Sequence, residues 1–267
     1  MKKLLLAAAA AIALSVNAAQ AVSVEYYGGT VEFAKHIGKC YDEAPSTLRT
    51  WISNPAPKVV VVKDFATFAK LDGLVGFPAG TIKKHASPHL TALAMQGNPD
   101  RGIIRSLIMV EDRHPKPFNE LETCSVVIHE MMHLYDFKYG TTNAEKSGAA
   151  EMQQAYKEDI ADANAFYKKK STSKETKKYI DGALRHYISS PTEAFAETAA
   201  TIVYFHPEAE WYNTMSFIFP RMMKLVRAQL VLDKIIPADY AGKGGTPAAA
   251  PIPTDIPSGK IMSEARP

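Results

Sequence analysis

Long hydrophobic runs are missing from this sequence of 267 residues. The most apolar stretch, from Leu4 to Val16, has 13 residues, whereas a helix needs about 18 or more to span a bilayer. Lys2 and Lys3 precede this stretch, and small residues around Ala21 follow it. This is the pattern of a secretory signal peptide cleaved after Ala21. We therefore expect residues 1–21 to direct export to the bacterial periplasm or medium, with no stable membrane insertion after cleavage.

An excess of charge of one sign is also missing. The formal net charge is +3, and it falls to +1 when residues 1–21 leave with two lysines and no acidic residue. Nucleic-acid-binding domains usually carry a strongly basic surface. We therefore expect no nucleic-acid partner, and the sequence indicates no particular oligomeric state.

Cysteine is scarce, and two cysteines so far apart, neither of them in a C-x-x-C motif, argue against a redox or zinc-finger role. The two cysteines, Cys40 and Cys124, would sit in an oxidising compartment after export, where disulfides persist. Pairing them would close a loop of more than 80 residues and would stabilise the fold by about 4 kcal/mol. The alternative is a pair of unpaired buried thiols, and we favour the disulfide.

What the sequence does contain is a set of strand signals in its first half. Residues 59–62 (VVVV) and 103–110 (IIRSLIMV) are apolar runs bounded by turn residues, which predict buried strands. Weaker signals cover residues 81–86 and 90–96. Short helices are predicted over residues 31–41 and 65–71, on either side of the first strand.

The second half, from Asn119 to about Leu232, reads as helical. Asn119 is a suitable N-cap, and Gly140 a suitable stop, for the first helix. The expected helices cover residues 119–139, 149–169 and 191–205, followed by one that opens at Pro207 and carries Trp211 towards the core. The chain thus predicts an α+β fold in which a small mixed sheet precedes a mainly helical half.

Residues 22–236 are long enough for one domain with a single core. From about residue 237 the composition shifts to proline, glycine and alanine. Such a segment has too few large apolar side chains to form a packed core. We expect residues 237–267 to be a disordered tail.

The strongest chemical signal is the run His129-Glu130-Met131-Met132-His133. In a helix, positions i and i+4 lie about 40° apart around the axis and about 6 Å along it. Both imidazoles would therefore face one metal ion, with Glu130 beside them as a general base. The alternative is a pair of core histidines satisfied by hydrogen bonds.

A catalytic zinc ion usually takes three protein ligands and leaves a fourth position for water. The best third ligand lies in the otherwise apolar helix of residues 191–205, which carries Glu193 and Glu197 at i and i+4. Burying two carboxylates without a partner is costly. A cation explains them, with Glu193 on the metal and Glu197 accepting the second ring proton of a ligand histidine. The alternative is a solvated helix edge.

Asp136 lies three residues after His133, close to the same helix face. It is a rival third ligand. We favour an outer role, as support for a histidine, because a ligand on the same helix would leave the two distant glutamates unexplained. An ordinary surface aspartate is the remaining alternative.

Together these residues resemble a known family. His129-Glu130-x-x-His133-x-x-Asp136, followed by Thr192-Glu193-Ala194-Phe195-Ala196-Glu197, is similar to the gluzincin-like zinc peptidase domain of anthrax lethal factor and the Pro-Pro endopeptidases. The resemblance covers residues 119–232 in element order and is specific at the two motifs. It implies a zincin-like fold, Glu193 as the third zinc ligand and Glu197 as its outer companion. It also implies that residues 103–110 form the edge strand to which a substrate peptide adds.

In that family a tyrosine seven residues before the ligand glutamate stabilises the oxyanion. Here that position holds His186, and Tyr187 follows it. Tyr187, His186 or Tyr179 could fill the role, and we favour Tyr187.

These features predict an exported endopeptidase that uses one zinc ion to cleave a peptide or protein substrate, with Glu130 as general base. One alternative is an inactive zinc-binding module that recognises a peptide or an envelope partner. The intact Glu130 argues against that alternative, because a binding module needs no base. A secreted toxin or effector protease would share the chemistry and differ only in its target.

Overall fold

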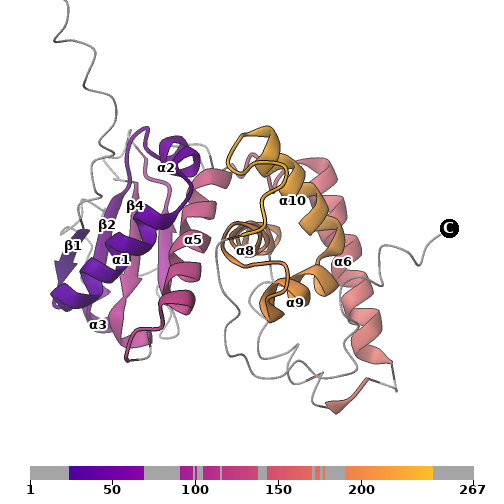
Figure 1. The fold of residues 1–267 in the computed structure, drawn as a ribbon, viewed down its shortest axis with the longest axis horizontal. Helices are drawn as coiled ribbons and strands as arrows, with labels where there is room; N and C mark the ends of the chain where they lie inside the picture. The colour runs from indigo at the N-terminus through magenta and orange to yellow at the C-terminus, as the bar shows by residue number, and fades with distance from the viewer. Residues whose placement is uncertain are drawn as a thin grey trace, which may run out of the picture.

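The computed structural model describes residues 24–68, 91–98, 100, 105–114, 116–137, 143–169, 172–174, 177 and 190–242. Over these residues the chain is a mixed α+β structure. A small sheet and its helices form the first half, and a mostly helical second half lies beside it (Figure 1). This arrangement confirms the predicted order of a small mixed sheet followed by helices. The predicted signal peptide lies outside the described residues.

Within the described residues, four strands form one mixed sheet in the order β1-β2-β4-β3. Strands β1, β2 and β4 are parallel, and β3 pairs antiparallel with β4. Their bounds are Val24–Tyr27 for β1, Lys58–Val62 for β2, Ala92–Met95 for β3 and Ser106–Val110 for β4. The strands predicted over residues 59–62, 90–96 and 103–110 are thus confirmed where the structure describes them. The strand predicted over residues 81–86 lies outside the described residues, and β1 was not predicted.

Both faces of the two central strands are buried, which explains why their sequences are apolar at successive positions rather than alternating. One face joins the main core, and it consists of Val59, Val61, Leu107 and Met109. The other face packs with Phe68 of the short helix α3 (Phe65–Phe68).

Helix α1 (Val31–Glu43) covers the core face of the sheet together with α5 (Glu120–Asp136). Thr30 caps α1, because its hydroxyl accepts a hydrogen bond from the backbone N–H of Phe33 at 3.1 Å. A second helix, α2 (Ser46–Ile52), follows directly and was not predicted. It begins after a proline and has no side-chain cap, so its sequence carries a weak start signal.

The predicted N-terminus of α5 is confirmed, since Asn119 accepts hydrogen bonds from two backbone N–H groups of the first turn. Its predicted end near Tyr139 is wrong, because the helix ends at Asp136. The next residue, Phe137, has an extended backbone with φ −93° and ψ 136°. Phe137 pairs with Ala144 in an antiparallel bridge, and this contact with the returning chain replaces another helical turn.

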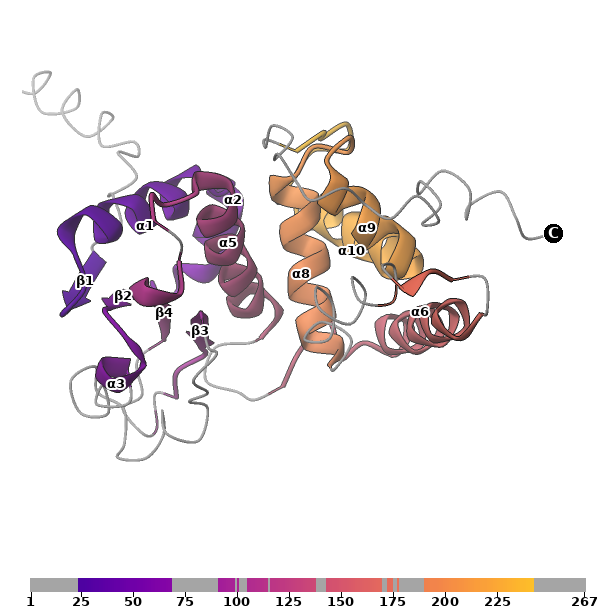
Figure 2. The same ribbon diagram turned by 90° about the horizontal axis from the view of Figure 1, so that it is seen from below.

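The second half consists of α6 (Ala150–Lys168), α8 (Pro191–Tyr204), α9 (Glu210–Ile218) and α10 (Pro220–Leu232). Figure 2 shows α8 lying along α5, with α9 and α10 on the side of α8 away from the sheet. The predictions for α6 and α8 are confirmed to within one residue. The prediction of a single helix from Pro207 is wrong, because Pro220 begins a new helix after a break at Phe219.

The predicted tail begins with a packed segment. The hydroxyl of Tyr240 donates to the carbonyl of Val203 at 2.7 Å, and the Arg227 side chain donates to the carbonyls of Ala238 and Tyr240. The chain thus packs on the helices as far as Tyr240, and residues 243–267 lie outside the described residues. No helix within the described ranges has the length and the hydropathy needed to cross a membrane.

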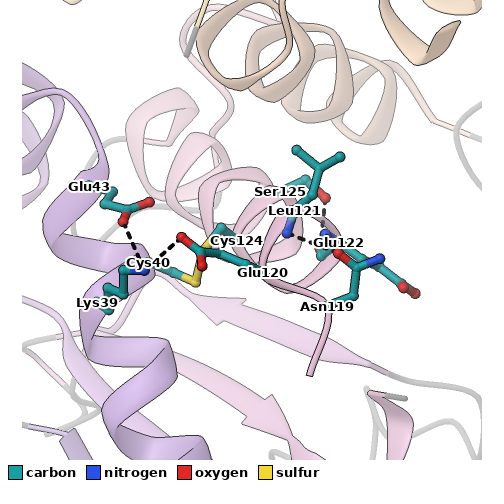
Figure 3. Close-up of a disulfide and its surroundings, with 9 residues drawn as sticks. All are labelled: Lys39, Cys40, Glu43, Asn119, Glu120, Leu121, Glu122, Cys124 and Ser125. Carbon is teal, nitrogen blue, oxygen red and sulfur yellow. Dashed lines mark hydrogen bonds and ion pairs between the residues drawn. A yellow bond between two sulfur atoms is a disulfide. The ribbon is translucent and has the colours of Figure 1, made fainter. Parts of the chain in front are cut away.

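The predicted disulfide is confirmed. It joins Cys40 of α1 to Cys124 of α5, two positions separated by 84 residues, and both cysteines are fully buried (Figure 3). The bond ties the helix that carries the His-Glu-x-x-His motif to the helix that covers the start of the sheet.

We expect the double variant Cys40→Ala/Cys124→Ala to lose about 4 kcal/mol of unfolding free energy, because its unfolded chain is no longer closed into a loop. Urea denaturation of the variant and of the oxidised wild type measures this difference. The reduced wild type is the control, since it keeps both sulfur atoms in the core. Equal denaturation midpoints for all three would contradict the expected stabilisation.

Candidate metal centre

The packing of α8 against α5 brings three predicted ligands together. The Nε2 atoms of His129 and His133 are 3.1 Å apart. Each lies 3.3 Å from the same oxygen, Oε2 of Glu193. His129, His133 and Glu193 therefore form a group that could hold a metal ion.

Local sequence places Glu193 in the first turn of α8. Ser190 caps this helix through its side chain, and Pro191 occupies the first turn, where a missing N–H is tolerated. Alanines at 194, 196, 199 and 200 are buried, and such small side chains let α8 approach its neighbours closely. The two glutamates thus lie on an apolar helix pressed against the histidines.

The spacing of the three ligand atoms suits a zinc ion. Zinc bonds nitrogen and oxygen at about 2.0–2.2 Å in a tetrahedral arrangement, which separates neighbouring ligand atoms by about 3.3–3.6 Å. The observed separations of 3.1 and 3.3 Å are close to that range. The donor set, two imidazoles and one carboxylate, is also one that zinc uses in catalytic sites.

The electrostatics of the group favour a cation. Glu197 places Oε2 2.8 Å from Nδ1 of His129, while Glu193 faces the Nε2 side of the same ring. Burial alone would lower the pKa of His129, but the two carboxylates outweigh burial and raise it to about 10. A positive charge, either a proton or a metal ion, is therefore stable at this position.

Glu197 lies where the prediction requires it, with Oε2 in contact with Nδ1 of His129. A bond on the other side of this carboxylate was not predicted: Nε1 of Trp211 donates to Oε1 of Glu197 at 2.6 Å. Trp211 was assigned to the core from its helical spacing, and it does pack there. Sequence periodicity places the ring on a buried face but carries no information on where the indole N–H points.

Glu130 is 7 % exposed and lies within electrostatic reach of His129, His133 and Glu193. Burial raises the pKa of its carboxyl, and the charges of the two histidines oppose the increase. The backbone N–H of Ala94 in β3 donates a hydrogen bond to this carboxylate. The predicted base thus lies between the two histidines and the sheet.

The edge strand near this site differs from the predicted one. Strand β4, expected at the edge, lies between β2 and β3, so the edge strand is β3. The carbonyl of Thr91 accepts a hydrogen bond from the N–H of Val110. In this register the backbone N–H and carbonyl groups of the odd-numbered residues of the segment face β4. The backbone groups of Ala92 and Ala94 then point away from β4, towards the edge on which no other strand of the described residues pairs with β3.

Two polar side chains hold the last turn of α5 in place. Gln96 follows β3 and donates its amide to the carbonyl of His133 at 2.9 Å. The buried Arg105 donates to the carbonyls of Leu134 and Ile52, at the ends of α5 and α2. A guanidinium at two helix C-termini satisfies their terminal carbonyls and opposes their negative dipole ends.

Asp136 forms hydrogen bonds to the segment that follows α5, and its predicted support of a histidine stays a prediction. Its Oδ1 accepts hydrogen bonds from the backbone N–H groups of Lys146 and Ser147, at 3.0 and 2.8 Å. Its Oδ2 accepts from the Ser147 hydroxyl at 2.6 Å. The carboxylate thus anchors the chain that returns after α5, a non-local contact that the spacing to His133 does not reveal.

The candidates for oxyanion stabilisation, Tyr187, His186 and Tyr179, lie outside the described residues. Their role stays a prediction.

Comparison with known proteins identifies no relative: no protein-family model matches the chain, and neither a curated protein nor a solved structure matches it.

Proposed function

We propose that this chain is an exported zinc-dependent endopeptidase with a zincin-like fold. The observation that carries the proposal is the convergence of His129, His133 and Glu193 on one point, with the buried Glu130 on the same helix as the histidines. Two imidazoles, one carboxylate and a neighbouring glutamate are the parts that metal-assisted amide hydrolysis needs. The predicted signal peptide supports export.

His129, His133 and Glu193 would hold the ion, and Glu197 with Trp211 would keep the His129 ring in its orientation. When bound, zinc supplies the Lewis acidity that activates a water and polarises the scissile carbonyl. Glu130 would take the proton of that water and deliver it to the leaving amine. Tyr187, or else His186, would donate a hydrogen bond to the developing oxyanion, as the family resemblance implies.

The free edge of β3 offers a means of binding an extended substrate. Ala92 directs its N–H and carbonyl, and Ala94 its carbonyl, away from β4, and a peptide can add to such an edge as a further strand. Because Ala94 also contacts Glu130, a peptide on this edge would lie next to the proposed base.

The direct test is zinc analysis of the purified protein, combined with incubation with a peptide library. We expect about one zinc ion per chain and cleavage that a chelator abolishes and added zinc restores. Stoichiometric zinc without cleavage of any peptide would contradict the peptidase and favour a non-catalytic zinc-binding module.

The variant Glu130→Gln should keep zinc but lose turnover by at least about 100-fold, because it can no longer accept the proton of water. Its zinc content and kcat are measured together. Glu122→Gln, an exposed change on the same helix, is the control and should leave both unchanged. Wild-type turnover in Glu130→Gln would remove the general-base assignment.

The two glutamates of α8 should behave differently when changed. Glu193→Gln removes a ligand and should abolish stoichiometric zinc binding, whereas Glu197→Gln should weaken zinc affinity by about 10–100-fold. Competition with a chromophoric chelator measures both affinities. If Glu197→Gln were the variant that loses zinc, the assignments of ligand and outer support would have to be exchanged.

Zinc binding should release about one proton per chain near pH 7. The metal-free site has a protonated His129, since its pKa is about 10, and a ligand imidazole must be neutral. Zinc affinity should therefore rise as the pH rises towards that pKa. Titration calorimetry in buffers of different ionisation enthalpy counts the proton, and a heat independent of the buffer would contradict this expectation.

A further inference from the structure

A third side chain lies beside the Cys40–Cys124 disulfide. His36 and Cys40 occupy positions i and i+4 of α1, so they share a helix face. Cys124 comes from α5. A ring nitrogen of His36 and the two sulfur atoms all lie within 4.8 Å of one another. Two cysteines and one histidine at this separation form a group that could hold a metal ion.

The state of His36 supports this interpretation. Its Nε2 is buried, and no group among the described residues forms a hydrogen bond with it. The ring stacks on Phe118, with 5.9 Å between centroids and 21° between planes. Burial lowers the pKa of His36, and the nearby carboxylate of Glu120 opposes this decrease.

In the oxidised protein both sulfur atoms are bonded to each other, and thiolates are what soft metal ions require. We propose that reduction of the Cys40–Cys124 disulfide turns this cluster into a second metal site, with His36, Cys40 and Cys124 as ligands for zinc or a similar ion. A dithiol or phosphine reductant supplies two electrons and converts the disulfide to two thiols. Binding of the divalent ion then displaces their two protons.

Two charged side chains lie beside the cluster. Figure 3 shows Glu120 and Lys39 beside the disulfide, and their side chains pair with each other at 2.7 Å. Three protein ligands with an open fourth position is a known zinc arrangement, and two cysteines with one histidine form one such set.

This second site is independent of the proposed peptidase function. Cys124 precedes His129 by five residues of α5, which is about 7.5 Å along the helix axis. The ligand sets also differ, since the group around His129 contains no sulfur. A spectroscopic probe that detects thiolate bonds therefore reports the second site alone.

The test uses cobalt(II), which takes the place of zinc and shows near-ultraviolet charge-transfer bands when thiolates bind it. The full chain is studied as the oxidised protein and after reduction with a phosphine that is then removed under anaerobic conditions. We expect one additional cobalt ion with thiolate bands in the reduced protein only. His36→Ala should weaken this binding at least tenfold, while the control Lys39→Ala, on the same helix, should not.

Two results would overturn the proposal. One is a reduced, folded protein with two titratable thiols and no thiolate bands. The other is a reduced His36→Ala variant that binds cobalt as tightly as the wild type does.

If reduction unfolds the chain, the variant His129→Ala/His133→Ala gives a second measurement with the other site removed. The proposal then requires zinc to restore the circular dichroism of the reduced variant, because binding to the folded state stabilises it. Failure of zinc to do so would contradict the second site.

Discussion

The contact between α5 and α8 is the interaction on which the site depends. Neither helix alone offers three ligands: α5 supplies the two histidines, and α8 supplies Glu193. The contact in turn depends on how α5 is held, by the disulfide at Cys124 and by hydrogen bonds from Gln96 and Arg105 to its last turn. A shift of α8 along α5 by one helical turn, about 5.4 Å, would separate the carboxylate from the imidazoles.

This contact also creates an electrostatic constraint. Glu130 and Glu197 are buried and Glu193 is only partly exposed, so three carboxylates crowd around two imidazoles. Uncompensated burial of such charges is costly, and the raised pKa of His129 shows how strongly the group retains a positive charge. A metal ion would neutralise more of this charge than a single proton does. The site is thus arranged for a cation before any substrate is considered.

The sequence predicted correctly those helices, strands and ligand spacings that depend on residues close together in the chain. The run of valines in β2, the Asn119 cap and the spacing of His129 and His133 each depend on neighbours in the chain. The features that were missed depend on distant partners: α5 ends where Phe137 meets Ala144, and β4 is interior because β3 pairs with its other side. The bond from Trp211 to Glu197 joins two helices through a side-chain orientation that periodicity does not reveal.

We propose that α5 and α8 hold one metal ion jointly. X-ray absorption at the zinc edge tests it most directly, with the oxidised protein loaded with one equivalent of zinc. We expect the spectrum to show two imidazole nitrogens and oxygen ligands at about 2.0–2.2 Å from zinc, with no sulfur. A sulfur shell at about 2.3 Å, or a spectrum without imidazole scattering, would place the ion elsewhere and contradict a site shared by α5 and α8.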